Sequence, residues 1–342
     1  MGEEQILKGE FPIISGPIND LAWDGESKRI IAVGDGRERY FPNCPSSASG
    51  LSCCFMTLAD HSLRYGHCVT FDTGNSVGEI AGHSSPINSV AIRPVRPYRA
   101  ATASDDRTIV FYHGPPFKFN SQLREHHSNF VQGVAFSPNG DHLVSVSSDR
   151  AICIFDGKTG EYKSKIGGGE NDHKGAIFSV SWSPDSKRFV TASADQTVKL
   201  WDIETAKATH TWKLGPGTGY TLPYQQVGVV WPNRADGTII SISFSGDLNY
   251  LNEKDEEPFR VITGHQKSIT SLGSTGDGKT IFTGSYEGRV CSWDISKGGA
   301  TALGGESHTN QVSGIEAING KALSVGWDDK LRTVNVASGS FV

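Results

Sequence analysis

The sequence predicts an all-β protein assembled from one small sheet unit that is repeated along the chain. His83, His127, His173, His265 and His308 are separated by 44, 46, 92 and 43 residues, and the third interval is two periods of 46. Between them lie short runs of alternating apolar and polar residues bounded by turn residues, which is the pattern of strands with one buried face. The 40 glycines among 342 residues suit a chain that turns tightly many times. A regular period of this length predicts a repeat architecture.

The stretch from His173 to Asp202 contains a complete unit and serves as the reference. Phe178, Val180 and Trp182 alternate with serines, which predicts a first strand with these three side chains on its buried face. The remaining parts are a turn at 183–186, a second strand at 187–192, a tight turn at 195–196 and a third strand at 197–201. Because so small a sheet is marginal in water, we expect each unit to pack against its neighbours.

Four polar residues of the reference unit lie where strands end and turn, and we predict that they form a structural tetrad. His173, Ser193, Asp195 and Trp201 can link carboxylate, imidazole, hydroxyl and indole in one hydrogen-bonded chain. Unpaired, such buried groups would each cost about 1–3 kcal/mol. A His/Ser/Asp set also fits a hydrolase triad. We reject that interpretation because the set ends in tryptophan and recurs with the repeat.

The other units follow the same order along the chain. The first repeat has strands at 18–23 and 29–33, and the others run over 83–112, 127–156, 225–251, 265–293 and 308–334. The fifth is degenerate, with Gln225 and Gln226 where a histidine is expected. Residues 1–16 are predicted to be an outer-strand remnant of a preceding unit.

These motifs resemble the WD-repeat β-propeller family. Trp201-Asp202 and Trp293-Asp294 are the full family dipeptide, and Gly82-His83 and Gly264-His265 are its Gly-His pair. The resemblance implies a ring of about seven four-stranded blades over residues 17–342.

One segment interrupts the first repeat. Residues 41–65 lack strand alternation, contain three of the six cysteines and stand where a short turn is expected, and their removal restores a normal hairpin sequence. Arg39-Tyr40 before the segment is repeated as Arg64-Tyr65 at its end. Translation of an in-frame intron would produce this duplication. We therefore hypothesise a retained intron in the gene model, with a genuine surface loop as the alternative.

Two loops of the second repeat are unusual. The run 93–99 combines three arginines, two prolines and a tyrosine, and the run 114–119 combines two prolines with two phenylalanines. Arginine and apolar residues on loops are typical of protein-binding rims. The alternative is that Phe117 and Phe119 simply form the next outer strand.

Composition limits the functional classes. A net charge of −5 without a basic run argues against nucleic acid or an anionic membrane surface as a partner. The chain shows no span of about 20 apolar residues and no signal-peptide layout, so we expect a cytoplasmic protein. The six cysteines lack metal-type spacing, and no acid or histidine cluster stands apart from the tetrad. We expect no catalytic residue, no metal and no cofactor, hence no enzyme.

Several stretches resemble a narrower family. They include 14–39, 65–84, 92–106, 114–120, 125–140 and 175–202, and they look like the N-terminal propeller of actin-interacting protein 1. This resemblance implies a monomeric partner of actin filaments that works with cofilin in filament disassembly and end capping, at the actin cytoskeleton. It also implies a partner-binding surface at Glu125, Glu170, Asp172 and Phe178. Phe178 lies on a first strand and fits the core equally well.

Two further expectations remain open. Members of this family are similar over two tandem propellers, whereas this chain covers one ring's worth of sequence, so we expect a truncated copy. The competing function is that of a generic WD-repeat scaffold or substrate receptor in another complex.

Overall fold

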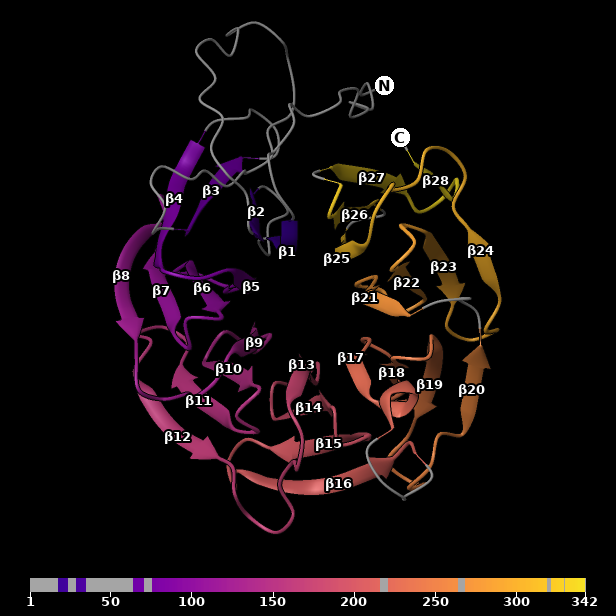
Figure 1. The fold of residues 1–342 in the computed structure, drawn as a ribbon, viewed down its shortest axis with the longest axis horizontal. Helices are drawn as coiled ribbons and strands as arrows, with labels where there is room; N and C mark the ends of the chain where they lie inside the picture. Colours follow the sequence, from indigo (N-terminus) through magenta and orange to yellow (C-terminus); the bar gives the residue numbers. More distant parts are fainter. Residues whose placement is uncertain are drawn as a thin grey trace, which may run out of the picture.

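A computed structural model describes residues 18–23, 29–34, 64–70, 76–215, 221–263, 268–318, 321–328 and 330–341. The proposed outer-strand remnant at 1–16 lies outside these residues, and so does the insertion except for its last two residues. Within the described part, seven antiparallel four-stranded sheets form a ring around a central channel (Figure 1). The predicted all-β propeller is confirmed.

Each blade takes its four strands from one continuous stretch of chain. Blade 1 contains β1 (Ile18–Trp23), β2 (Arg29–Gly34), β3 (Arg64–Thr70) and β4 (Ser76–His83). Blade 2 contains β5 (Ile87–Ile92), β6 (Arg99–Ser104), β7 (Ile109–His113) and β8 (Lys118–Leu123). Blade 3 contains β9 (Val131–Phe136), β10 (His142–Ser147), β11 (Ile152–Asp156) and β12 (Tyr162–Ile166). Blade 4 contains β13 (Ile177–Trp182), β14 (Arg188–Ser193), β15 (Thr197–Asp202) and β16 (Lys207–Lys213).

The remaining blades continue the same order. Blade 5 follows the short 3₁₀ helix η1 (Leu222–Tyr224) and contains β17 (Gln226–Val230), β18 (Ile239–Ser243), β19 (Asp247–Leu251) and β20 (Arg260–Thr263). Blade 6 contains β21 (Ile269–Ser274), β22 (Thr280–Ser285), β23 (Val290–Asp294) and β24 (Ala300–Ala302). Blade 7 contains β25 (Val312–Ile318), β26 (Lys321–Gly326), β27 (Leu331–Asn335) and β28 (Ser340–Phe341). The first strand of each blade lines the channel.

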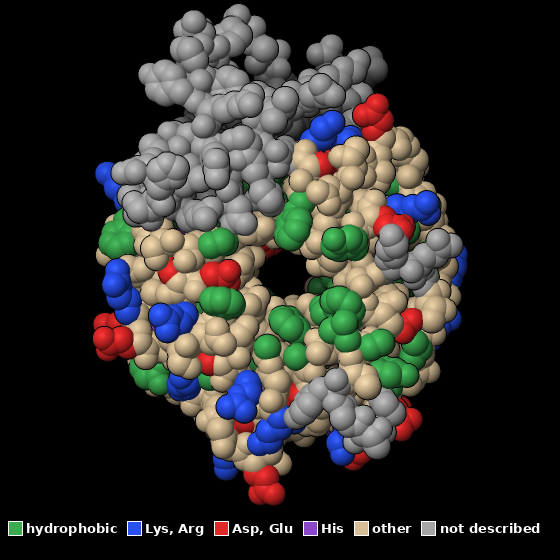
Figure 2. Space-filling model, in the orientation of Figure 1, with side chains coloured by type: hydrophobic (Ala, Val, Ile, Leu, Met, Phe, Trp, Pro, Cys, Tyr) green, Lys and Arg blue, Asp and Glu red, His purple; other side chains and the backbone are tan. Residues whose placement is uncertain are grey.

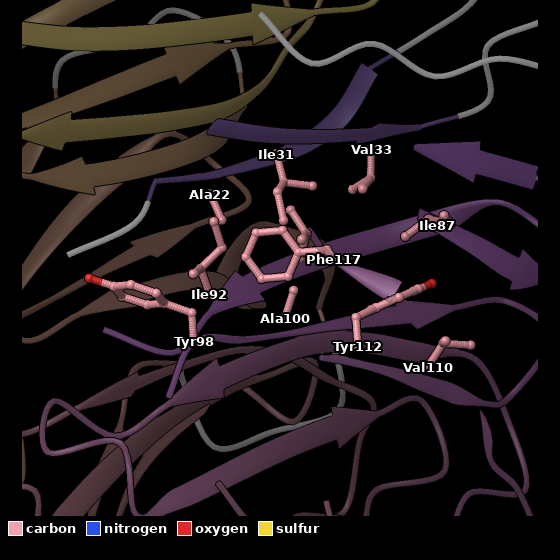
Figure 3. Close-up of a cluster of buried hydrophobic side chains, with 11 residues drawn as sticks. Ala22, Ile31, Val33, Ile87, Ile92, Tyr98, Ala100, Val110, Tyr112 and Phe117 are labelled. Atoms are coloured by element: carbon pink, nitrogen blue, oxygen red, sulfur yellow. The ribbon is translucent and has the colours of Figure 1, made fainter. Parts of the chain in front are cut away.

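The hydrophobic core consists of separate clusters between neighbouring blades. The cluster between blades 1 and 2 joins Ile31 and Val33 of β2 to residues of β5, β6 and β7 (Figure 3). Phe117 lies within this cluster and is 1% exposed, while Phe119 on β8 is 53% exposed. The run 114–119 is therefore the entry to an outer strand, as the simpler interpretation held. Burying such aromatic area between sheets is what holds each blade to the next.

Arg93 has a structural part as well. It is 1% exposed, and its guanidinium donates to the carbonyl oxygens of Gly140, Val95 and Pro97. Because Gly140 belongs to blade 3, this arginine ties the loop of blade 2 to the adjacent blade. A buried guanidinium with these partners braces the fold and presents no charge to a ligand.

The ring closes between the last blade and the first. β25 packs against β1, and the hydroxyl of Ser313 on β25 donates to the carbonyl oxygen of Ile18 on β1. No strand of the described residues crosses this seam, because every sheet is continuous in sequence. Closure therefore depends on the same side-chain contacts that join the other blades.

Candidate partner-binding face

One face of the ring carries the loops that enter each inner strand and the turns between second and third strands. We name it the histidine face, because His83, His127, His173 and His308 stand in those loops. In blades 2 to 7 a backbone hydrogen bond ties the turn to the loop, for example from Ala194 N–H to the carbonyl oxygen of Ala176. The face is therefore a rigid platform with its backbone polar groups largely satisfied.

The reference blade contains a hydrogen-bonded chain under this face. His173 Nδ1 lies 2.8 Å from Asp195 Oδ2, and His173 Nε2 lies 2.7 Å from Thr191 Oγ1. The indole N–H of Trp201 donates to the same hydroxyl at 2.7 Å. With Nδ1 protonated toward the carboxylate, Nε2 accepts the proton of Thr191.

The prediction of Ser193 as the hydroxyl of this chain was wrong. Thr191, two residues earlier on β14, occupies that position, and Ser193 Oγ instead accepts from the N–H of Asp195 at 3.2 Å. Both side chains lie on the same face of β14, since strand side chains alternate with period two. Ser193 stands at the end of β14, where its hydroxyl oxygen accepts a hydrogen bond from a backbone N–H of the turn.

The pKa shifts of Asp195 and His173 agree with a structural role for this hydrogen-bonded chain. Burial alone would raise the pKa of the Asp195 carboxyl, but hydrogen bonds from His173, Thr197 and the Lys174 N–H outweigh it and hold the pKa well below its ordinary value. Burial lowers the pKa of His173. At neutral pH the pair is thus a carboxylate accepting from a neutral imidazole. Thr191 is fully buried, so its hydroxyl cannot meet a substrate.

The chain recurs in other blades with substitutions. His83 bonds Asp106 and Thr102, His127 bonds Asp149 and Ser145, and His308 bonds Asp328 and Ser324. Blade 5 replaces histidine with Gln226, whose amide bonds Ser241, Ser243 and Asn249. His265 of blade 6 lies outside the described residues. Because the same hydrogen-bonded chain recurs in several blades, it belongs to the repeat itself. This supports the interpretation that the chain stabilises the fold.

A β-bulge interrupts every inner strand at its second residue. In β13 the pairing with β14 skips from Ile177 to Ser179, so Phe178 is the extra residue. Bulges re-aim one side chain. The seven bulge residues all line the channel: Asn19, Asn88, Gln132, Phe178, Val227, Thr270 and Ser313.

Phe178 consequently lines the channel and is only partly buried. The expectation that it shares one buried face with Val180 and Trp182 was wrong, because the bulge breaks the alternation at this residue. Trp182 alone of the three is buried, at 6% exposure. Phe178 is therefore available at the channel mouth on the histidine face.

The bulge residues differ in what they do for the ring. Asn19 and Asn88 donate to the carbonyl oxygens of Ile87 and Val131 in the next blade, each at 3.0 Å. Thr270 and Ser313 make the equivalent bond across their own seams. A phenyl ring cannot donate such a bond, so Phe178 occupies this position without the bracing function that Asn19, Asn88, Thr270 and Ser313 have.

The predicted acidic residues lie on the same face as Phe178. Glu125 stands in the loop before β9, is exposed and has a backbone φ of 68°. Glu170 is exposed in the loop before β13. Asp172 follows in that loop, but its carboxylate accepts from the N–H of Gly169 at 2.7 Å. Glu125 and Glu170 are therefore available to a partner, while Asp172 also shapes its own turn.

Other site classes find no support in the described ranges. Within them, no group of three or more His, Cys, Asp or Glu side chains could hold a metal ion. The same residues include no helix with the length and apolar character that a bilayer crossing requires.

Comparison with known proteins gives a consistent result. The family described as WD domain, G-beta repeat matches residues 74–113, 117–156, 169–202 and 256–294. The chain is 44% identical over 340 residues to an uncharacterized WD repeat-containing protein of Schizosaccharomyces pombe. It is 37% identical over 342 residues to actin-interacting protein 1 of Drosophila melanogaster and 40% identical over 336 residues to that of Caenorhabditis elegans. These alignments cover 99%, 100% and 96% of this chain but 51%, 50% and 49% of the relatives. The chain thus spans about half the length of the curated relatives it matches.

Proposed function

Because the chain belongs to the WD-repeat family of actin-interacting protein 1, we propose that it binds actin filaments and cooperates with cofilin to promote filament disassembly and end capping. The observation that carries the proposal is the near-complete alignment of this chain with two proteins named for their interaction with actin. We further propose that the protein acts as a monomer in the cytoplasm, without nucleic acid or membrane as a partner.

The histidine face offers a surface compatible with this proposal. Glu125 and Glu170 are exposed acids there, and Phe178 is an aromatic residue at the channel mouth. Exposed acids and an aromatic side chain on one face suit a protein partner that presents basic and apolar side chains. We propose that these residues and Asp172 contact the actin–cofilin filament.

The first test is co-sedimentation of the full chain with actin filaments, with and without cofilin, followed by a disassembly assay. Cofilin-dependent pelleting and faster disassembly are expected. If the folded, monomeric chain stays in the supernatant under both conditions, the alternative of a generic WD-repeat scaffold or substrate receptor replaces this proposal.

A substitution tests the placement of the surface. Glu125→Ala should weaken cofilin-dependent disassembly several-fold without changing thermal unfolding, since the side chain is exposed. The matched control is Glu161→Ala, an exposed glutamate of the same blade in the turn between β11 and β12, on the opposite face. Equal activity of the Glu125 variant and the wild type would remove this residue from the surface.

A further inference from the structure

The turns between second and third strands provide an internal comparison. The first residue of this turn donates its N–H to the loop before the inner strand in each of blades 2 to 7. The acceptors lie at 2.8 to 3.1 Å in all six blades. In chain order the six donors are Asp105, Ser148, Ala194, Phe244, Tyr286 and Trp327. This turn position is therefore structurally equivalent in the six blades. Its side chain is small or acidic in blades 2 to 4 and aromatic in blades 5 to 7.

The aromatic side chains at this position are more than a third exposed. Phe244 is 38% exposed, Tyr286 57% and Trp327 43%. Blades 2 to 4 build the same turn with aspartate, serine and alanine, so the backbone does not require an aromatic residue. Large apolar side chains left in water at three consecutive equivalent positions need another explanation.

These residues continue into a larger apolar surface. Leu222 and Tyr224 of η1, at the entry to blade 5, are 53% and 41% exposed. Val227 and Phe178 are the two apolar members of the bulge ring, in adjacent blades 5 and 4. Figure 2 shows hydrophobic side chains gathered beside the channel mouth and over the blades at lower right. We name Tyr224, Phe244, Tyr286 and Trp327 the aromatic arc.

The other half of the histidine face has a different character. Arg107, Arg150 and Lys174 are exposed there together with Glu125 and Glu170, so both signs of charge are present. The two halves adjoin at blades 4 and 5, where Phe178 and Val227 line the channel. The histidine face therefore has an aromatic sector and a charged sector, and both surround the mouth of the central channel.

We propose that the aromatic arc is the apolar half of the surface that holds the actin filament, and that Glu125, Glu170 and Phe178 are its polar continuation. This inference rests on the proposed function and extends it from blades 3 and 4 to blades 5 to 7. Its basis is that the arc lies on the same face as the proposed contact residues, and that the apolar bulge residues Phe178 of blade 4 and Val227 of blade 5 line the channel where the two sectors adjoin. Aromatic residues dominate the centres of protein interfaces, because each buries 150–250 Å² with few rotatable bonds.

The decisive variant is the triple substitution Phe244→Ser, Tyr286→Ser and Trp327→Ser. Serine already stands at the equivalent position 148, so the turn accepts it without a change of backbone. The matched control is Val261→Ser, which removes an apolar side chain that is 54% exposed on outer strand β20, away from the histidine face. Thermal unfolding of both variants checks that the ring is intact.

We expect the triple variant to bind cofilin-decorated filaments at least about tenfold more weakly than the wild type, because loss of one interface hot spot costs about 2 kcal/mol or more. The control should bind like the wild type. If the wild type pellets and the folded triple variant pellets equally well, the arc is excluded while the proposed function stands. If the wild type itself does not pellet with filaments, both fail.

A second copy of this chain is the other occupant that the experiment detects. Light scattering of the wild type and the triple variant is measured alongside sedimentation. A wild-type dimer that the triple substitution converts to monomer, with filament binding unchanged, would assign the arc to self-association and overturn the proposal.

Discussion

Blades 4 and 5 are neighbours with the same four-stranded topology, but the polar networks that brace them differ in chemistry. Blade 4 links a carboxylate, an imidazole, a hydroxyl and an indole through His173 and Asp195. Blade 5 replaces this chain with the neutral amide of Gln226, which is fully buried and bonds Ser241, Ser243 and Asn249. Asp195 has no acidic counterpart in blade 5, because Ser245 stands at the equivalent turn position.

The comparison shows that the blade needs satisfied polar groups and does not need a particular set of them. Both networks connect the entry of the first strand to the second and third strands through hydrogen bonds between buried side chains. The two networks differ in their sensitivity to pH, since only the network of blade 4 contains ionisable groups. The histidine chain is one of two ways in which these blades pair their buried polar groups. The presence of His and Asp in it is therefore no reason to infer catalysis.

The largest predicted effect comes from breaking the ionisable network. Asp195→Ala leaves the buried His173 without its partner, and we expect the free energy of unfolding to fall by about 3 kcal/mol. Ser245→Ala at the equivalent position in blade 5 should change it by less than about 0.5 kcal/mol, since Ser245 is exposed. Urea unfolding measures both. Equal effects would show that the carboxylate is not what braces blade 4.

The same variant has a pH signature. The pKa of Asp195 is depressed by folding, so its contribution is present above the unfolded pKa and is lost as pH falls through the folded value. The stability difference between the wild type and Asp195→Ala should therefore shrink in acid.

The neutral network gives the next largest effect. Gln226→Ala removes an amide that bonds three buried side chains, and we expect a loss of about 2 kcal/mol. Because no ionisable group is involved, this loss should be the same between pH 5 and pH 8. A strongly pH-dependent loss would contradict the description of blade 5 as neutral.

The seam between blades 7 and 1 contains buried carboxyl groups that blades 4 and 5 lack at the equivalent strand position. Glu316 on β25 stands where blade 4 has Ser181 and blade 5 has Val230. Burial, reinforced by the nearby charge of Asp20, raises the pKa of Glu316 to about 8. Burial also raises the pKa of Asp20 to about 6, although the N–H groups of Val90 and Leu21 oppose the shift.

A raised carboxyl pKa means that folding favours the protonated form. This stabilisation is complete below the unfolded pKa and is lost as pH rises through about 8. Glu316→Gln should therefore unfold like the wild type near pH 5 and be more stable by about 1–2 kcal/mol at pH 9. Thermal or urea unfolding at both pH values decides it. A variant less stable than the wild type at pH 9 would show that the ionised carboxylate is tolerated at the seam.

How far the sequence could predict these features depends on which interactions set them. The strands of blade 4 were predicted to within a residue or two, because local alternation and turn residues mark their ends. Thr191 was missed because it and Ser193 share one face of β14, and only the register of three strands decides which hydroxyl meets His173. Phe178 was assigned to a buried face because a bulge leaves no mark in a run of alternating residues.

The aromatic arc was also missed, although a signal existed. Aligning the repeats on the residue after each second strand places Phe244, Tyr286 and Trp327 in one column with Asp105, Ser148 and Ala194. The alignment does not show that these three aromatic side chains are exposed, since phenylalanine, tyrosine and tryptophan also occur in the core of this protein. It required the turn geometry and its hydrogen bond to the preceding loop.

The smallest predicted effect concerns residues 41–65. β2 ends at Gly34 and β3 begins at Arg64, so residues 41–63 fall between these two strands in the sequence and the last two residues of the segment belong to β3. Deletion brings Arg39-Tyr40 in front of Gly66, which restores the Arg-Tyr that begins β3 and keeps its pairing with β4. Shortening a connection recovers about 0.6 kcal/mol per halving, and a tight turn opposes part of that gain.

We therefore expect the deletion variant to be more stable than the full chain by about 1 kcal/mol. Urea unfolding of the two chains measures this difference, and sequencing of the transcript tests the intron hypothesis independently. Clear destabilisation by the deletion would show that the segment contributes contacts of its own. Blade 1 would then differ from the other blades by a genuine surface loop rather than by a retained intron.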